Sequence, residues 1–275
     1  MESRLPTRRD GFRERGAQVT RLEAFVDAAF AFAVTLLVIR VGAVPDTIGE
    51  MIEALKGIPA FAASFALIAM FWSAHHTWSR RYGLDDGYGQ FLSLLLVFLV
   101  LVYVYPLRMM FGVAFGWASQ VLPEAWRIRG VADLAVPDLQ QMYIVYAIAW
   151  STLGLVVVLL YRHAWNRRVA LELSFEEQVA TRVELARWWL VPALGALSLA
   201  LALLLPFDVA REGSIIPGVP PMVYGLMGFT GLVMVLAERR VRARLAASAP
   251  PTATAPTGSS LLGKRRRRRR NRPPA

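Results

Sequence analysis

Long apolar runs alternate with short charged segments along most of this chain. Five stretches contain no charged residue, and each reaches the roughly 20 residues that a helix needs to cross a bilayer core. They are 57–79, 87–107, 139–161, 188–207 and 213–237. A sixth run, 24–39, is shorter and is interrupted near its start by Asp27. The pattern predicts an all-α polytopic membrane protein with six transmembrane helices.

The positions of the basic residues predict how these spans are oriented. If both termini lie inside, the inner segments hold 25 of the 31 Lys and Arg residues and the outer loops hold only 6. Cytoplasmic loops of membrane proteins carry such an excess of positive charge. We therefore expect a multi-pass protein of the cell inner (plasma) membrane with both termini in the cytoplasm. The longest connection, roughly 108–138, then lies outside, and 162–187 forms a charged, partly helical inner loop.

The two ends of the chain differ in composition from its apolar centre. Residues 1–20 form a polar, Arg-rich cytoplasmic segment, and 21–245 form the six-helix transmembrane domain. Residues 246–275 are rich in Ala, Pro, Thr and Ser and include a run of Lys and Arg, so we expect this tail to be disordered. No aromatic residue interleaves the basic run to stack on bases. We therefore expect lipid headgroups rather than a specific nucleic acid as its partner.

Composition and motifs exclude several function classes. The chain has no Cys, which excludes disulfides, thiolate metal sites and Cys nucleophiles, and its 3 His residues argue against a dedicated transition-metal centre. The H-E-x-x-H, G-x-S-x-G and G-x-x-x-x-G-K-[ST] motifs are absent. We therefore predict no enzyme activity, no cofactor and no metal. The T-V-G-Y-G filter of ordinary potassium channels is also absent, which excludes a conventional pore-loop filter.

The first span is the strongest candidate for a functional element. Asp27 places an ionisable group within an apolar run, which is costly in lipid and typical of functional sites. Helical spacing aligns Ala28, Phe32, Thr35 and Ile39 in one stripe that is apolar except for one hydroxyl. Such a stripe is more often a lipid-facing or bundle-core surface, and a Thr hydroxyl in a helix usually bonds to its own backbone. The stripe alone therefore does not decide between packing and permeation.

The second span ends with polar residues that match Asp27 in depth. His75 and His76 lie four or five residues inside Arg80, and Asp27 lies about six residues inside Arg21. At ~1.5 Å per residue, both groups lie roughly 6–9 Å from the inner boundary, so an antiparallel helix pair brings them together. Adjacent helical residues point ~100° apart, so the two His are a poor metal pair. A polar cluster is expected here, with a structural role and a gating or proton-linked role both open.

These two spans resemble the signatures of a known family. The run Arg21-Leu22-Glu23-Ala24-Phe25-Val26-Asp27 resembles the R-x-x-x-F-S-D motif that opens the first helix of the transmembrane protein 175 family, the endosomal/lysosomal-type potassium channels and their prokaryotic relatives. The run Phe71-Trp72-Ser73-Ala74-His75-His76 resembles the aromatic-W-x-x-H-H end of that family's second helix. Two departures matter: Val26 replaces the Ser, and Phe32 replaces the usual Ile or Leu of the first hydrophobic ring.

The resemblance implies a potassium-permeable channel whose first helices line the pore, assembled as a homotetramer in single-repeat bacterial members. K⁺ ions and the lipid bilayer are then the expected partners. Carried over by position, the constriction falls on Phe32, Thr35 and Ile39, along the stripe that begins at Ala28. The candidate inner polar cluster, with gating as its predicted role, comprises Arg21, Phe25, Asp27, Trp72, His75 and His76. A ring of Phe32 side chains is expected to close the pore more tightly and dewet it more readily than aliphatic groups.

Two other functions stay open at this point. A proton-coupled secondary transporter would use Asp27, His75 and His76 as a proton relay, and substrate-dependent proton uptake would distinguish it from a channel. Spans four to six hold no second copy of the first-helix signature, which weakens this alternative. A non-conducting scaffold would show no ion flux.

Overall fold

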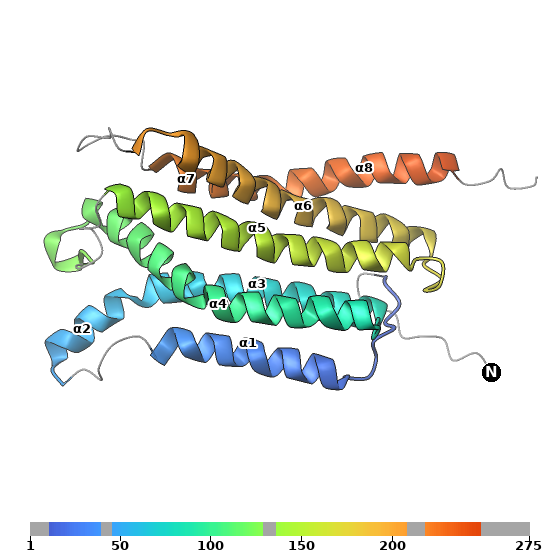
Figure 1. Cartoon of the computed structure of the whole chain (residues 1–275), viewed down its shortest axis with the longest axis horizontal. Helices are drawn as coiled ribbons and strands as arrows, with labels where there is room; N and C mark the ends of the chain where they lie inside the picture. Colours follow the sequence, from blue (N-terminus) through green and yellow to red (C-terminus); the bar gives the residue numbers. More distant parts are fainter. Residues whose placement is uncertain (1–10, 40–45, 129–135, 208–217, 249–275) are drawn as a thin grey trace, which may run out of the picture.

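Helices make up nearly all of the chain that the structure describes. The computed structural model describes residues 11–39, 46–128, 136–207 and 218–248 (Figure 1). The α-helices in these ranges are α1 (Arg21–Ile39), α2 (Ile48–Lys56), α3 (Ile58–Tyr82), α4 (Gly87–Ala118), α5 (Val136–Asn166), α6 (Phe175–Leu204), α7 (Val219–Met222) and α8 (Thr230–Ser248). The 3-10 segments are η1 (Ser119–Val121), η2 (Glu124–Trp126) and η5 (Val223–Phe229). No β-strand occurs within the described ranges, and the predicted all-α class is confirmed.

Five helical stretches of the described chain are long and apolar enough to cross a membrane. They are Ile58–Tyr82, Gly87–Val121, Asp138–Asn166, Phe175–Leu204 and Val219–Leu245. Helix α1, which has 19 residues and includes Arg21, Glu23 and Asp27, is not among them. These five stretches support the polytopic architecture. The prediction of six spans additionally requires that α1 crosses the membrane.

Helix α4 continues past the charge that was predicted to end it. The outer connection was expected to start at 108, but Arg108 lies within α4, which ends only at Ala118. This boundary was wrong because the segment after Arg108 is apolar, and one charged residue does not stop a helix whose following residues favour it. Pro106 is also accommodated inside α4. Trp117, expected in the loop, consequently lies in the last turn of the helix.

The predicted inner loop at 162–187 is helical over most of its length. Helix α5 extends to Asn166, and α6 already begins at Phe175. Ser174 starts α6 through a reciprocal capping box: its side chain accepts the Glu177 N–H, and the Glu177 carboxylate accepts the Ser174 N–H. Only the turn between Asn166 and Ser174 is therefore left to connect the two helices.

The last predicted span, 213–237, is not one regular helix. Residues 213–217 lie outside the described part, and α7 and η5 precede α8, which begins only at Thr230. Prolines at 220 and 221 and glycines at 225 and 228 explain this, because both residue types weaken an α-helix. Helix α8 then runs to Ser248, past the predicted boundary at 245. The remainder of the expected disordered tail lies outside the described residues.

Helix α1 lies at one side of the bundle and α6 and α8 lie at the other, with α3, α4 and α5 between them (Figure 1). Helices α5 and α6 make the most extensive contact, and two glycines allow their backbones to approach closely. A Cβ atom at Gly195 would collide with the Ser151 side chain and lie 3.0 Å from the Ala147 carbonyl oxygen. A Cβ atom at Gly154 would lie 2.5 Å from a methyl carbon of Val191.

Residues 12–17, which we call the N-terminal strap, tie the chain before α1 to the start of α6. Arg13 and Arg15 each place a terminal guanidinium nitrogen 2.9 Å from the Glu177 carboxylate, which is only 2% exposed. Arg13 also donates to the Glu172 carbonyl, and Arg15 donates to the Leu171 carbonyl at 3.0 Å. The hydrogen bond to Glu177 raises the pKa of Arg13 above its ordinary value. The strap therefore holds the turn between α5 and α6 with paired charges.

The apolar part of the strap packs against the carboxyl-terminal end of α3. Phe12 is buried and meets the ring of Tyr82 edge-on, with ring centroids 5.4 Å apart. The guanidinium of Arg81 lies over the Phe12 ring, 5.1 Å from its centroid. The strap thus contacts both α3 and the α5–α6 turn immediately before it leads into α1.

Replacing Gly195 with Ala is expected to lower the free energy of unfolding by about 1–3 kcal/mol, because the added methyl group overpacks the α5–α6 contact. Thermal unfolding of the purified protein in detergent measures this change. The matched control is Gly231→Ala in α8, where nothing lies within 4 Å of an added Cβ atom. The control is expected to be neutral or stabilising by up to ~1 kcal/mol. Equal melting temperatures for the two variants would contradict the close approach.

Replacing Glu177 with Gln is expected to destabilise the protein by about 2 kcal/mol or more, because two guanidinium groups lose the buried charge that they share. The same thermal unfolding assay applies. Glu176→Gln is the control, since Glu176 pairs with Arg242 on the exposed surface, where an ion pair contributes about 0–1 kcal/mol. A Glu177→Gln variant as stable as its control would show that the strap is not held by this carboxylate.

Candidate functional site

Helix α1 has one packed face and one exposed face. Val26, Phe30, Ala33 and Leu37 are buried against the core that the other helices complete. The opposite face is exposed along the helix and consists of Arg21, Ala24, Phe25, Ala28, Ala31, Phe32, Thr35 and Val38. An exposed apolar strip of this length on a membrane protein faces either lipid or another protein chain. We call it the α1 outer face.

The predicted stripe lies on the α1 outer face. Ala28 and Thr35 are exposed, and the Phe32 side chain is 54% exposed. The side chain of Ile39, the fourth stripe residue, lies outside the described residues. No other part of the described chain buries this stripe, so the packing interpretation in which it forms the core of the chain's own bundle does not apply.

Thr35 presents an acceptor rather than a donor on this face. Its hydroxyl donates to the Ala31 carbonyl oxygen one turn earlier, at 3.0 Å. A hydroxyl has one hydrogen and two acceptor lone pairs. Because the hydrogen is used within the helix, the exposed side of the Thr35 oxygen can only accept, which suits a cation or a water molecule.

Asp27 contacts Trp72 in the amino-terminal half of α1. The indole Nε1–H of Trp72 donates to Asp27 Oδ1 at 2.8 Å, and this bond joins α1 to the antiparallel α3. The Trp72 indole stacks on the His76 ring, with centroids 5.3 Å apart. The polar cluster at this depth therefore forms, but a tryptophan rather than a histidine pairs with Asp27.

Glu23 is the second carboxylate of the cluster, and it is more buried than Asp27. Its side chain is 3% exposed and Oε1 lies 3.6 Å from His76 Nδ1 and 3.4 Å from Arg80 Nε. In the sequence, Glu23 was named only as part of the first-helix motif, and no role was predicted for it. The signal was its place one helical turn before Asp27, which puts both carboxylates on the side of α1 that faces α3.

His75 lies on the other side of α3, toward α4. Its Nε2 is 2.9 Å from the hydroxyl oxygen of Ser93, and both side chains are buried. The Ser93 hydroxyl also lies 2.8 Å from the Gly89 carbonyl, to which it donates, so the His75 Nε2–H donates to Ser93. The expected grouping of Asp27 with both histidines is thus corrected: adjacent helical residues diverge, and His75 and His76 contact different helices.

Two residues of the expected cluster lie on the α1 outer face instead. Arg21 is exposed and makes no ion pair with another described residue. Phe25 is 55% exposed, on the same side as Phe32. They do not join Asp27 and Trp72 in contact, but they continue the exposed strip toward the inner end of α1.

Arg108 holds the outer end of α1. Its guanidinium donates to the carbonyl oxygen of Leu37 in the last turn of α1, at 2.9 Å. A cation at the carboxyl end of a helix is favourable because the unsatisfied carbonyls there carry partial negative charge. The contact lies beside an open cavity of about 920 Å³ between α1, α3, α4 and α5. Sequence reasoning missed this role, since a carbonyl partner leaves no pattern in the sequence.

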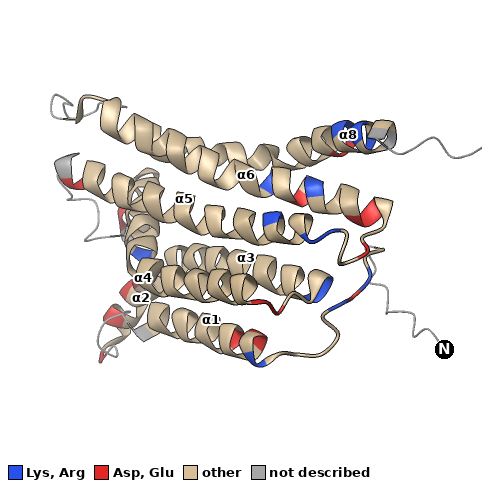
Figure 2. Ribbon diagram, turned by 45° about the vertical axis from the view of Figure 1, so that its right-hand side comes forward, with Lys and Arg blue, Asp and Glu red and all other residues tan. Residues whose placement is uncertain are grey.

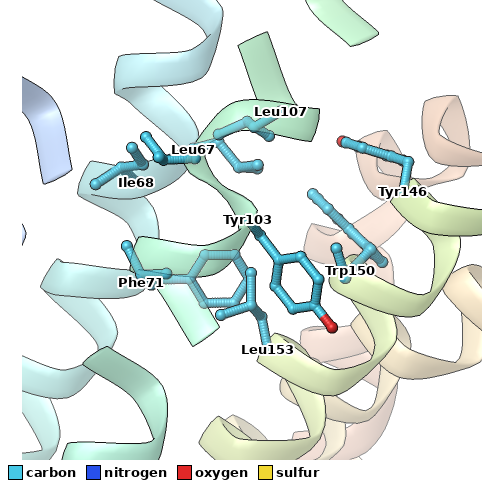
Figure 3. A pocket seen from close by; sticks show the side chains of 11 residues that line it. Leu67, Ile68, Phe71, Tyr103, Leu107, Tyr146, Trp150 and Leu153 are labelled. Atoms are coloured by element: carbon cyan, nitrogen blue, oxygen red, sulfur yellow. The ribbon is translucent and has the colours of Figure 1, made fainter. Parts of the chain in front are cut away.

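A second cavity lies inside the bundle between α3, α4 and α5. Apolar side chains line it, among them Leu67, Leu107 and Leu153, and the rings of Tyr103 and Trp150 close it (Figure 3). Its volume is about 20 Å³, which is room for about one water molecule. This space is a packing gap without a polar path. Among the residues that the structure describes, no group of three His, Cys, Asp or Glu side chains is placed to hold a metal ion.

Comparison with known proteins identifies the family. The model of the endosomal/lysosomal potassium channel TMEM175 matches residues 21–106, which include α1 and α3. A potassium channel from Marivirga tractuosa is 30% identical over 207 residues, which cover 73% of this chain and 81% of that protein. The chain belongs to the TMEM175 family. Proteins of this family are potassium channels and not enzymes.

The fold agrees with a solved member of the TMEM175 family. The crystal structure of a variant of the potassium channel MtTMEM175, in complex with a nanobody–MBP fusion protein, superposes with a TM-score of 0.69 at 25% sequence identity. The superposition covers 89% of this chain and 100% of the other. The family match begins at Arg21, so the α1 outer face and the Asp27–Trp72 contact both lie within it.

The Asp27–Trp72 hydrogen bond is expected to contribute ~1–2 kcal/mol to stability, as a partly exposed bond to a charged acceptor. Trp72→Phe keeps an aromatic ring but removes the donor. A double-mutant cycle with Asp27→Ala, which removes the acceptor, isolates the coupling between the two side chains by thermal unfolding. Trp189→Phe serves as control, because Trp189 is an exposed tryptophan of α6. A coupling energy near zero would mean that this bond does not hold α1 to α3.

Proposed function

We propose that this chain forms a potassium-permeable cation channel in which copies of α1 surround the pore. The observation that carries the proposal is the exposure of Ala28, Phe32 and Thr35 on a helix whose opposite face is packed. We infer that the permeant ion is K⁺ because the chain belongs to a family of potassium channels. No conventional pore-loop filter is needed, because the proposed filter is the helix face itself.

The proposed pore requires more than one copy of the chain. Helix α1 lies at the edge of the bundle, so one copy contributes a single wall (Figure 1). We propose a homotetramer, as the family resemblance implies for a chain with one repeat. In this arrangement α1 faces the symmetry axis, whereas α6 and α8, on the opposite side, face the surrounding lipid.

Selectivity in the proposed pore rests on the cost of dehydration and on one ring of oxygen atoms. Phe32 and Ile39 would provide apolar rings on either side of Thr35. A cation passing them sheds part of its hydration shell and then meets the Thr35 oxygens, whose lone pairs face outward because the hydroxyl hydrogens bind Ala31. A ring of this kind favours the ion that loses water most readily.

Gating in the proposed channel follows from wetting of the Phe32 ring and rotation of α1. A hydrophobic constriction closes by dewetting. The Asp27–Trp72 bond and the Glu23 contacts with His76 and Arg80 set the rotation of α1 against α3. A change in these contacts would turn Phe32 toward or away from the axis. The dispersal of Asp27, His75 and His76 among separate partners makes a continuous proton relay, as the transporter alternative requires, the weaker hypothesis.

Thr35→Val is expected to lower K⁺ over Na⁺ discrimination several-fold, because the substitution keeps the side-chain shape and removes the oxygen ring. Planar-bilayer recording of the purified protein with K⁺ and Na⁺ on opposite sides gives the permeability ratio. Thr152→Val is the matched control: Thr152 bonds to its own helix in the same way, at 2.8 Å from the Ile148 carbonyl, but lies on α5. The control is expected to keep the wild-type ratio.

Two results would contradict the proposal. An unchanged permeability ratio in Thr35→Val would remove Thr35 from the filter, and equal losses in both variants would point to a general effect on folding. Absence of any ion flux from the purified wild-type protein would reject the channel itself and favour the scaffold alternative.

A further inference from the structure

The inner end of the bundle carries a cluster of arginines that no carboxylate neutralises in the described structure. The guanidinium carbons of Arg168 and Arg182 lie 4.8 and 4.0 Å from the centroid of the Trp165 ring. We call these three residues the Arg–Trp site. Arg168 lies in the α5–α6 turn and donates to the Trp165 carbonyl, whereas Arg182 comes from α6. Stacking on an aromatic face holds both guanidinium groups while leaving donors free.

Electrostatic repulsion acts on the Arg182 guanidinium of this site. Arg168 and Arg244 are the charged groups that act on Arg182, and both repel it. The structure gives Arg168 and Arg182 no ion pair with a described carboxylate. Like charges held close together repel one another, and an anion that binds between them relieves this repulsion.

Several acidic residues near this end of the bundle interact with arginines outside the Arg–Trp site. Glu176 and Glu238 both bind Arg242, at 2.7 and 3.1 Å. Glu177 is bound by the strap arginines. Glu172 acts electrostatically on Arg13. The counter-charge of the Arg–Trp site is therefore expected to come from outside the chain.

The surroundings of the site match the surface of a membrane. Arginines of α5, α6 and α8 lie toward the end of the bundle that the N-terminal strap reaches (Figure 2). Apolar side chains stand out beside the site: Val169 is 78% exposed and Phe175 is 40% exposed. An indole flanked by cations and apolar groups is the composition that anchors proteins at the level of lipid headgroups.

We propose that Trp165, Arg168 and Arg182 form a binding site for the phosphate group of an anionic phospholipid headgroup at the inner membrane surface. The two guanidinium groups bind the phosphate oxygens through charge-assisted hydrogen bonds. Val169 and Phe175 contact the adjoining acyl region. The site lies on the side of the bundle away from α1, so it does not depend on which helix lines a pore (Figure 1).

Native mass spectrometry of the full chain in detergent, titrated with phosphatidylglycerol or phosphatidylcholine, tests the proposal. The double variant Arg168→Gln/Arg182→Gln is compared with Arg239→Gln/Arg240→Gln, which removes two exposed charges of α8 at the same end. Both variants keep the basic tail, so any contribution of the tail to lipid binding is the same in the two variants. We expect wild-type protein to bind phosphatidylglycerol in preference, and the site variant to weaken this binding at least about tenfold more than the control variant.

A third variant separates a formed site from a diffuse positive surface. Trp165→Leu leaves every charge in place but removes the ring that holds the guanidinium groups, and it is expected to weaken phosphatidylglycerol binding while a melting curve verifies folding. Equal losses in the two Arg→Gln pairs, unchanged binding by Trp165→Leu, or equal binding of the two lipids by wild type would each overturn the site. If inorganic phosphate stabilised the protein as much as phosphatidylglycerol does, the site would bind phosphate in general, and the proposal of a lipid headgroup would be wrong.

Discussion

The rotation of α1 about its own axis is the constraint on which the candidate site depends. Carboxylates within an apolar helix are not left unpaired toward lipid, and α1 carries two, Glu23 and Asp27, which both face α3. Glu23 lies between a histidine and an arginine, and Asp27 accepts the indole N–H of Trp72. Once these contacts place that side of α1 against its neighbour, the 3.6-residue period leaves Phe32 and Thr35 on the opposite side. The α1 outer face is therefore exposed because the two carboxylates of α1 pair on its opposite side, against α3.

The same helix is held at both ends by contacts that involve arginine. At the outer end, Arg108 of α4 binds a carbonyl in the last turn of α1. At the inner end, the strap that precedes α1 is bound through Arg13 and Arg15 to Glu177 at the start of α6. While these contacts hold, the exposed face of α1 stays turned away from the chain's own bundle. In the membrane that face must be covered by lipid or by further copies of the chain. The outward lone pairs of a threonine interact more favourably with cations or water than with acyl chains.

Features that follow from periodicity were predictable from the sequence, whereas features that follow from packing were not. Apolar runs identified the long helices, and helical spacing alone placed Ala28, Phe32 and Thr35 in one stripe of the first span. Charged residues were poor markers of helix ends, as Arg108 shows, because a long side chain reaches a partner without interrupting the backbone. The pairing within the inner cluster also escaped prediction. Residue spacing along the helix axes predicted that Asp27 and the histidines lie at one depth. Which side chain pairs with Asp27 depends instead on how α3 is rotated about its own axis, and tertiary contacts set that rotation.

The positive charge at the inner end divides into two sets with different consequences. One set is neutralised within the chain: the strap arginines share a buried carboxylate, and Arg80 lies beside Glu23. These charges fix helices relative to one another and stabilise the fold. The other set, which includes the two guanidinium groups stacked on Trp165, has no acidic partner among the described residues and lies on the side away from α1. An excess of arginine on the inner loops therefore does more than orient the spans. It also leaves charge that we propose is neutralised by anionic lipid headgroups, which lie at the end of a membrane bundle.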